Sequence, residues 1–280
     1  MPTQQDKATA FHQLHHSGEI LLLPNIWDPL GALLLEDLKY PAVATASASI
    51  AYANGYNDGE NIPFVQLISI LKSIAGRVSV PVSADIESGY ASDNKQLAEN
   101  IRQIIDAGVV GINLEDTDAK TDFLLPTGLQ CRKIECIRNT SEKMNVRLFI
   151  NARTDVFISG IFTGDMEEKI AEAISRARQF KSAGADGFYP ILLNDKDAIQ
   201  KIVEEVEMPV NIIMMPGIPE LKVLQEMGVA RVTLGPGFFK IAVKAMKDIA
   251  SKLQNRQGVD EVISNDITSD YLKKLAGKNQ

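Results

Sequence analysis

Residues 103–116 read QIIDAGVVGINLED, and this stretch holds the unit from which the fold is built. A polar-apolar helical pattern stops at Ala107, Gly108 follows, and an apolar run from Gly111 to Asp116 comes next. Glycine after a helix supplies the left-handed residue that ends it. A glycine in the same position, after a helical pattern and before an apolar run, occurs in Ala183-Gly184-Ala185 and Met227-Gly228-Val229. The repetition predicts several helix-to-strand units of one kind.

Eight short apolar runs, each followed by a helical pattern, extend this unit over the chain. Runs that are nearly apolar throughout are typical of parallel strands buried on both faces, and eight such units predict a (β/α)₈ TIM-type barrel. We expect one catalytic domain over residues 1–254 and a partly helical C-terminal extension over 255–280. The predicted strands are Ile20–Pro24, Ala42–Ser47, Val80–Glu87, Gly111–Asp116, Arg147–Thr154, Gly187–Ile191, Val210–Met215 and Arg231–Gly235. The predicted helices cover 28–38, 63–75, 92–107, 129–143, 167–182, 194–206, 219–227 and 237–254.

Composition narrows the classes of function. The formal net charge of the 280 residues is −7, which argues against a nucleic-acid binder, since such proteins carry a basic patch. No apolar run approaches the roughly 18 residues of a membrane span, and the N-terminus has no signal-peptide pattern. The two cysteines, Cys131 and Cys136, lie at a spacing that disfavours a disulfide and fits no zinc motif. We therefore expect a cytoplasmic protein.

Carboxylates follow two neighbouring predicted strands. Asp85 and Glu87 end one strand, and an i, i+2 pair is expected to point to one side of it. Glu115 ends the next strand on the same side as Asn113. Because active sites of such barrels lie at the carboxyl ends of the strands, three carboxylates would converge there. A Mg²⁺ ion held directly by Asp85, and through water by Glu87 and Glu115, would relieve their repulsion; a salt-bridged cluster is the alternative.

Other polar groups fall at the same end of the barrel. Arg153, in Asn-Ala-Arg-Thr-Asp, could grip a substrate carboxylate through two hydrogen bonds, or could pair with Glu115 or Asp155. The long segment from Thr117 to Thr127 is a candidate lid that carries Lys120 and Asp122 as possible acid/base groups, or is a solvated loop.

The absences are equally informative. His12, His15 and His16 are the only histidines and precede the barrel, which argues against a Ser-His-Asp or Cys-His mechanism. Neither GxGxxG nor GxxxxGK[ST] occurs, so no standard nucleotide loop is visible. The segment GVARVTLGPGFF could hold phosphate or make a tight turn into the last helix.

Five motifs in this order resemble the isocitrate lyase / phosphoenolpyruvate mutase superfamily. They are Thr45–Ala51 with Gly55-Tyr56-Asn57-Asp58-Gly59, Ala84-Asp85-Ile86-Glu87-Ser88-Gly89-Tyr90, Asn113-Leu114-Glu115-Asp116, Asn151-Ala152-Arg153-Thr154-Asp155, and PVNIIMMPG with LQEMGVARVTLGP. The resemblance covers about residues 15 to 250.

The resemblance implies a barrel enzyme that binds Mg²⁺, with Mn²⁺ as a possible substitute, and an α-oxo or α-hydroxy carboxylate. Asp85 would bind the metal directly, with Glu87 and Glu115 in its water shell. Asp58 would lie near the reacting group, and Lys120 would sit on a gating loop. The resemblance also implies exchange of the eighth helix between subunits of a homodimer or homotetramer. The substrate carboxylate would be held by Ser47, Ala48 and Arg153, with Asn151 of the same motif.

Two departures from the superfamily pattern guide the expected activity. The Lys-Lys-Cys-Gly-His segment of isocitrate and methylisocitrate lyases is replaced by TDAKTDFLLPT. The Lys-x-Asn-Ser gate of the mutase branch is Lys120-Thr121-Asp122-Phe123, where the extra negative charge would repel a phosphoryl group. We therefore expect a Mg²⁺-dependent lyase that cleaves a C–C bond in a small 2-oxo or 2-hydroxy acid through an enolate-like intermediate. A P–C bond enzyme and a non-catalytic binding barrel are the alternatives.

Overall fold

A ring of parallel strands forms the centre of the molecule. The computed structural model describes residues 2–277. The chain forms β1 (Leu21–Leu23), β2 (Asn25–Ile26), β3 (Val43–Thr45), β4 (Val82–Asp85), β5 (Gly111–Glu115), β6 (Phe149–Thr154), β7 (Gly187–Pro190), β8 (Asn211–Ile213) and β9 (Arg231–Thr233). β2 to β7 pair in chain order, and β1 pairs with β9, which pairs with β8. A bridge between Phe188 and Val210 joins β7 to β8 and completes the predicted barrel.

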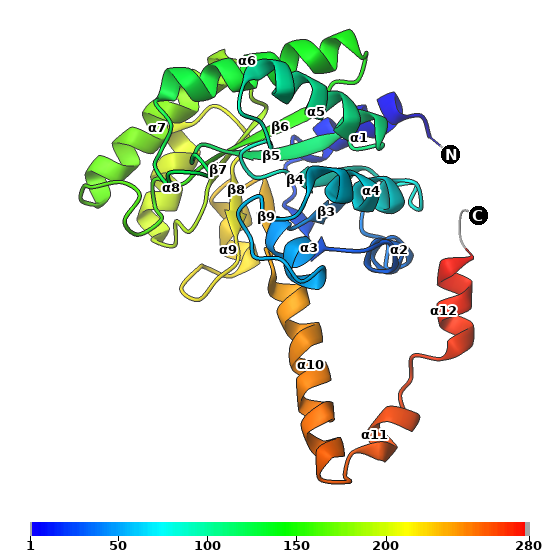
Figure 1. Cartoon of the computed structure of the whole chain (residues 1–280). Helices are drawn as coiled ribbons and strands as arrows, with labels where there is room; N and C mark the ends of the chain where they lie inside the picture. Colours follow the sequence, from blue (N-terminus) through cyan, green and yellow to red (C-terminus); the bar gives the residue numbers. More distant parts are fainter. Residues whose placement is uncertain (1, 278–280) are drawn as a thin grey trace.

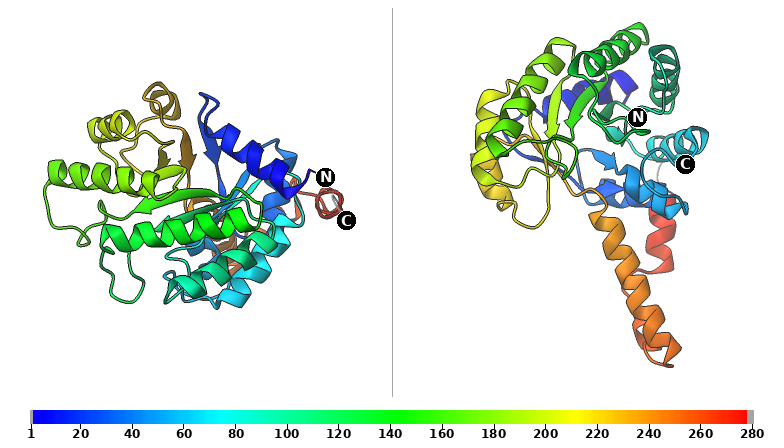
Figure 2. Two further views of the ribbon diagram at one scale, coloured as in Figure 1. Left: turned by 90° about the horizontal axis from the view of Figure 1, so that it is seen from above. Right: turned by 60° about the vertical axis from the view of Figure 1, so that its left-hand side comes forward.

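Helices surround this ring, as the two views in Figure 2 show. The ends of each helix lie within two residues of the predicted ends, and Gly108, Gly184 and Gly228 have the predicted positive φ. The covering helices are α2 (Pro29–Asp37), α4 (Phe64–Ala75), α5 (Asn94–Asp106), α6 (Thr127–Lys143), α7 (Met166–Ser182), α8 (Lys196–Glu205) and α9 (Leu221–Glu226).

The strands differ from the predicted ranges by one or a few residues at their ends, and three of these differences change the local structure. The first strand is divided at Pro24, which lacks the N–H that a continuous ladder needs. The second ends at Thr45, and Ser47 begins an unpredicted helix, α3 (Ser47–Ala53). The third ends at Asp85, and Glu87 has a left-handed φ of 52°. The i, i+2 argument for Asp85 and Glu87 was therefore wrong, because the chain has left the strand at Glu87.

The amino end of the barrel is closed by α1 (Gln4–Leu14). Phe11 is fully buried, and the next turn brings His15 to stack on Phe149 with ring centroids 3.9 Å apart. A Cβ at Gly111 would collide with the Phe11 ring, so glycine is required at the start of β5. With this end filled by aromatic rings, the open end of the barrel is the one where the strands terminate.

The last helix of the barrel, α10 (Gly237–Gln254), leaves the ring and projects away from it (Figure 1). None of its residues is buried, and Ile241 and Met246 are 67% and 61% exposed. The chain then turns through α11 (Val259–Ile263) and returns in α12 (Ser269–Ala276), which contacts α2. In residues 2–277, no helix is long and apolar enough to cross a lipid bilayer.

Candidate active site at the carboxyl ends of β4, β5 and β6

Asp85 is the last residue of β4 and is oriented by residues at and just after the end of β3. The Ser47 hydroxyl donates to Asp85 Oδ2 at 3.1 Å, and the Asp85 backbone N–H donates to Thr45 Oγ1 at 3.1 Å. No cationic side chain within residues 2–277 forms an ion pair with Asp85. It is therefore a carboxylate held in position by neutral hydrogen-bonding groups, without a direct cationic partner among the described residues.

Glu87 is buried beside it, with 3% of its surface exposed. Its two carboxylate oxygens accept from the Glu60 backbone N–H at 2.6 Å and the Tyr90 hydroxyl at 2.7 Å. Burial is the main cause that raises the pKa of Glu87 to about 7, and the charges of Asp58 and Asp85 add to it. The environment of Glu87 thus favours either a proton or a cation.

Glu115 and Arg153 stand opposite each other in the β5–β6 register and form an ion pair of 2.7 Å. Arg153 Nε also binds Asp155 at 2.6 Å. Burial and the neighbouring carboxylates raise the pKa of Glu115, whereas Glu115 and Asp155 hold the pKa of Arg153 above its ordinary value. Of the two interpretations of Arg153 that the sequence left open, the ion pair is present.

Asp116 links the ends of β5 and β6 beside the Glu115–Arg153 ion pair. It is fully buried, accepts from Thr154 Oγ1 at 2.7 Å and from the Asp155 backbone N–H at 2.9 Å, and pairs with Arg176 at 3.1 Å. Burial raises the pKa of Asp116 to about 6 despite that arginine. These bonds join the ends of β5 and β6 and fix the backbone that carries Arg153.

The structure brings Asp58 and α3 to the same place. Asp58 lies in the exposed loop after α3 and close to Ser47, and burial together with the charge of Asp85 raises its pKa. The backbone N–H groups of Ser47 and Ala48 belong to the first turn of α3, where they have no acceptor within the helix. The Ser47 N–H instead donates to Asp85 Oδ2 at 3.4 Å, so the start of α3 lies beside Asp85.

The candidate lid residues lie farther out. Lys120 and Asp122 are exposed on the loop between β5 and α6, and no hydrogen bond or ion pair described in residues 2–277 connects their side chains to the carboxylates. A bridge between Thr117 and Leu124 makes the loop a small antiparallel hairpin, and Phe123 at its tip is 68% exposed. Lys120 and Asp122, predicted as possible acid/base groups, therefore lie on a loop near the site without a described side-chain contact to the carboxylates.

Beneath the carboxylates, the barrel interior is polar. The Asn151 amide donates to Asn113 Oδ1 at 2.9 Å, so this motif residue faces another side chain of the barrel. Arg231, 1% exposed, reaches the same oxygen at 3.4 Å, and its Nε and Nη1 have no partner among the described residues. Sequence reasoning missed Arg231, although a charged residue that opens an apolar strand is a signal for it.

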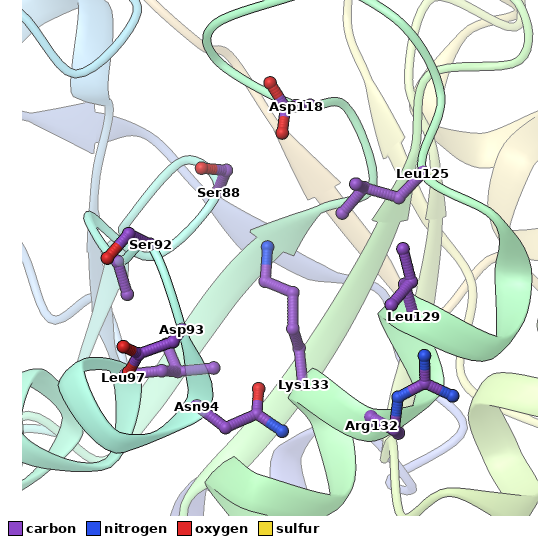
Figure 3. Close-up of a pocket in the computed structure, with 11 residues that line it drawn as sticks. Ser88, Ser92, Asp93, Asn94, Leu97, Asp118, Leu125, Leu129, Arg132 and Lys133 are labelled. Carbon is purple, nitrogen blue, oxygen red and sulfur yellow. The ribbon is translucent and has the colours of Figure 1, made fainter.

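A cavity of about 370 Å³ adjoins the site between the β4–α5 loop, the lid loop and α6 (Figure 3). Lys133 of α6 points into it, with Ser88 and Asp118 at its walls. Burial lowers the pKa of Lys133, and carboxylates led by Glu60 oppose that shift. Helical position alone gave no sign that Lys133 would be an inward-facing residue.

The donor set fits a metal held largely through water. In residues 2–277, no three His, Cys, Asp or Glu side chains converge closely enough for a direct ligand shell. Mg²⁺ commonly takes one or two carboxylates directly and keeps several waters. Asp85 has no ion-pair partner in residues 2–277, and burial raises the pKa values of Asp58, Glu87 and Glu115, so a cation beside them would stabilise their ionised forms.

The sequence is similar to proteins of a known family. The profile of the phosphoenolpyruvate phosphomutase family matches residues 11–254. The chain belongs to this family. It is therefore a member of the phosphoenolpyruvate mutase / isocitrate lyase superfamily. An uncharacterised Mycobacterium tuberculosis protein is 32% identical over 226 residues, 81% of each chain. Oxaloacetate decarboxylase 1 of Pseudomonas fluorescens is 27% identical over 253 residues, 88% of this chain and 84% of its own.

Solved structures share the fold. A candidate phosphonomutase of Burkholderia cenocepacia is 35% identical and covers 88% of this chain and 99% of its own, with a TM-score of 0.84. At lower identity the likeness shows the fold alone. 2,3-Dimethylmalate lyase (21% identical, TM-score 0.84) covers 99% of this chain and 95% of its own. Phosphonopyruvate hydrolase in complex with oxalate and Mg²⁺ (20% identical, TM-score 0.83) covers 97% and 95%.

Proposed function

We propose that this protein is a Mg²⁺-dependent lyase that cleaves a C–C bond in a small 2-oxo or 2-hydroxy carboxylic acid. The observation that carries the proposal is Asp85, an oriented carboxylate without a protein counter-ion, surrounded by acids of raised pKa at the open end of the barrel. Oxaloacetate decarboxylases and a 2-methylisocitrate lyase among its relatives support C–C chemistry.

Asp85 would hold Mg²⁺ directly, with Glu87 and Glu115 acting through water. When bound, the metal supplies a Lewis acid that stabilises negative charge on the oxygen at C2 of the substrate. Tyr90 and the Glu60 backbone N–H fix the orientation of Glu87, and Arg153 fixes Glu115. The chain thus presents three carboxylates whose positions are set before substrate arrives.

Arg153 and the start of α3 would hold the substrate carboxylate. Glu115 and Asp155 occupy three of the five N–H groups of the Arg153 guanidinium, which leaves two for a ligand. The Ala48 N–H, which has no acceptor within α3, would be a further donor, whereas the Ser47 N–H donates to Asp85 Oδ2 at 3.4 Å. Asp58 would be the acid/base, because its raised pKa and its place beside Ser47 suit a group that accepts a proton from substrate and returns it.

The test is direct assay with Mg²⁺. The enzyme is incubated with oxaloacetate, with 2,3-dimethylmalate and with phosphonopyruvate, and pyruvate release is followed. Release from either of the first two substrates, absent in Asp85→Ala and in EDTA, supports the proposal. Phosphate or phosphoenolpyruvate formed from phosphonopyruvate alone would overturn it.

That outcome would support the second candidate function, a P–C bond enzyme. It is favoured by the match to the phosphoenolpyruvate phosphomutase family and by the likeness at 35% identity to the Burkholderia cenocepacia protein. The acidic Asp122 on the lid loop argues against it, since a migrating phosphoryl group would be repelled.

The quaternary structure is part of the proposal. We infer that residues 1–254 form one catalytic unit and that α10, which has no buried residue in a single chain, packs against a second subunit of a cytoplasmic homodimer or homotetramer. Sedimentation equilibrium tests this inference. Ile241→Asp and Met246→Asp together should shift the protein to monomer, and an unaltered mass would contradict the exchange of this helix.

A further inference from the structure

The Glu60 carboxylate connects the loop that carries Glu87 to the loop that carries Asp58, and the proposed chemistry gives it no part. Oε1 of Glu60 accepts from the Ser88 hydroxyl at 2.6 Å and from the Tyr90 backbone N–H at 2.8 Å. Ser88 and Tyr90 belong to the loop between β4 and α5, whereas Glu60 belongs to the loop between α3 and α4. The side chain therefore crosses from one loop at the mouth of the barrel to the next.

Both donors to Glu87 belong to residues that this connection holds in place. The Glu60 backbone N–H donates to Glu87 Oε2 at 2.6 Å, and the Tyr90 hydroxyl donates to Glu87 Oε1 at 2.7 Å. The Glu60 carboxylate in turn accepts from the Tyr90 backbone N–H, which closes a ring of hydrogen bonds among the three residues. The positions of both donors to Glu87 therefore depend on the Glu60 side chain.

The backbone of this ring has an uncommon conformation. Glu60, Glu87 and Tyr90 have φ values of 56°, 52° and 54°, although none of them is glycine. Residues with a side chain rarely adopt left-handed φ values, and such conformations persist only where surrounding contacts fix them. The two bonds to Glu60 Oε1 are contacts of this kind. Their loss would favour ordinary φ values and release the Tyr90 hydroxyl from Glu87.

We propose that Glu60 is a positioning residue, which fixes Glu87 beside Asp85 and ties the loop of Asp58 to the loop of Glu87. Glu60 acts as a hydrogen-bond acceptor and neither binds the metal nor carries a proton. This inference rests on the proposed function and goes beyond it by adding a residue outside the carboxylates proposed to hold Mg²⁺.

The geometry separates a role as acceptor from a role as charge. Both bonds end on one oxygen, Oε1, and the side-chain carbonyl of glutamine offers one such oxygen on a side chain of the same length. Glutamine at position 60 should therefore preserve the ring of hydrogen bonds. Aspartate keeps the charge but is one methylene shorter, so its carboxylate cannot reach both donors.

A role through charge predicts the opposite order of these variants. The charge of Glu60 acts on Lys133 of α6, which lines the neighbouring cavity, and would also attract a metal ion directly. If that charge were what matters, aspartate would retain the function of Glu60 and glutamine would lose it. Comparison of the two substitutions therefore decides between the roles.

Calorimetric titration of Mg²⁺ into the full chain is the test. The Kd of Mg²⁺ should rise about 10- to 100-fold in Glu60→Ala and in Glu60→Asp, the range for loss of a partner that orients a metal ligand. It should stay within about five-fold of wild type in Glu60→Gln. Glu135→Ala, which removes an exposed glutamate of α6, is the matched control and should bind Mg²⁺ like wild type.

A double-mutant cycle with Glu87→Ala separates positioning from general damage to the fold. Because Glu60 acts on the metal through Glu87, Glu60→Ala should change the Mg²⁺ Kd by less than about three-fold in the Glu87→Ala background. General damage would weaken binding by the same factor in both backgrounds. Circular dichroism of each metal-free variant checks that it is folded, and if Glu60→Ala is not, the order of Glu60→Gln and Glu60→Asp decides.

The outcomes distinguish this inference from the proposed function. An unchanged Mg²⁺ Kd in Glu60→Ala, equal losses in the two backgrounds, or weaker binding by Glu60→Gln than by Glu60→Asp would each overturn the positioning role. Mg²⁺ binding by wild type would leave the proposed function intact in all three cases. Failure of wild type to bind Mg²⁺ would instead overturn the proposed function, and the role of Glu60 with it.

Discussion

Two arginines on the inner wall of the barrel have opposite surroundings. Arg153, at the mouth, is bound by Glu115 and Asp155 at 2.7 and 2.6 Å. Arg231, deeper in the barrel, has only a 3.4 Å contact with Asn113 Oδ1. Carboxylates raise the pKa of Arg153, whereas burial lowers the pKa of Arg231 to about 10. At Arg153 the neighbouring carboxylates offset the free-energy cost of burying the charge. At Arg231 no close counter-charge offsets that cost.

Asp85 lies within the electrostatic reach of both arginines, and its charge raises the pKa of each. It pairs with neither of them. The barrel therefore combines an ion pair at its mouth, an arginine without a close partner deeper inside, and one carboxylate that forms no ion pair within residues 2–277.

Asp85→Ala should abolish Mg²⁺ binding. Loss of even an outer partner of a metal costs about 10- to 100-fold in affinity, and a direct ligand should cost on the order of 100-fold or more. Calorimetric titration of Mg²⁺ measures the change, and Asp106→Ala, an exposed acid at the end of α5, is the control. If Mg²⁺ bound Asp85→Ala as tightly as wild type, the assignment of the metal site would be wrong.

Arg153→Met should destabilise the metal-free protein by about 3–5 kcal/mol, because Glu115 and Asp155 would remain buried without their cation. Urea unfolding followed by circular dichroism gives the free energy. Arg153→Lys keeps the charge but loses the two-pronged contact with Asp155, so its loss should be smaller. A loss below about 1 kcal/mol in Arg153→Met would show that Glu115 takes up a proton instead.

The fold was predictable because it depends on local signals that repeat. Gly108, Gly184 and Gly228 each end a helix in a left-handed conformation, and the apolar runs that follow are the strands. Boundaries at the mouth were not predictable. The small residues of α3 continue the pattern of β3, and nothing in the sequence shows that the chain turns into a helix at Ser47.

Site residues could be predicted where a charged side chain follows an apolar strand. Asp85, Glu87, Glu115 and Arg153 are charged residues at the ends of apolar strands, and the structure brings them together. Lys133 was missed because a lysine on a helix ordinarily faces water, and only the packing of α6 against the β4–α5 loop turns it inward. Lys120 and Asp122 depend on a loop conformation that no local pattern specifies.

Glu87 should make the stability of the metal-free protein depend on pH. Its pKa is raised from 4.5 to about 7. Between these two pH values the folded protein keeps a proton that the unfolded chain has lost, so the free energy of unfolding falls as pH rises through this range. Glu87→Gln removes this contribution. In EDTA, the unfolding free energy of wild type relative to Glu87→Gln should decrease by about 3 kcal/mol from pH 4.5 to pH 7.5. Parallel pH profiles for the two proteins would contradict the raised pKa.

Arg231→Met should have the smallest effect, within about 1 kcal/mol in urea unfolding. An apolar side chain of similar length that replaces a buried charge without a close partner removes the cost of desolvation and loses only one long contact. The matched comparison is Arg153→Met, in which the same substitution breaks two short ion pairs. If Arg231→Met instead lost 3 kcal/mol or more, Arg231 Nε and Nη1 would have to be bound to ordered water or an anion inside the barrel, and the contrast between the two arginines would not hold.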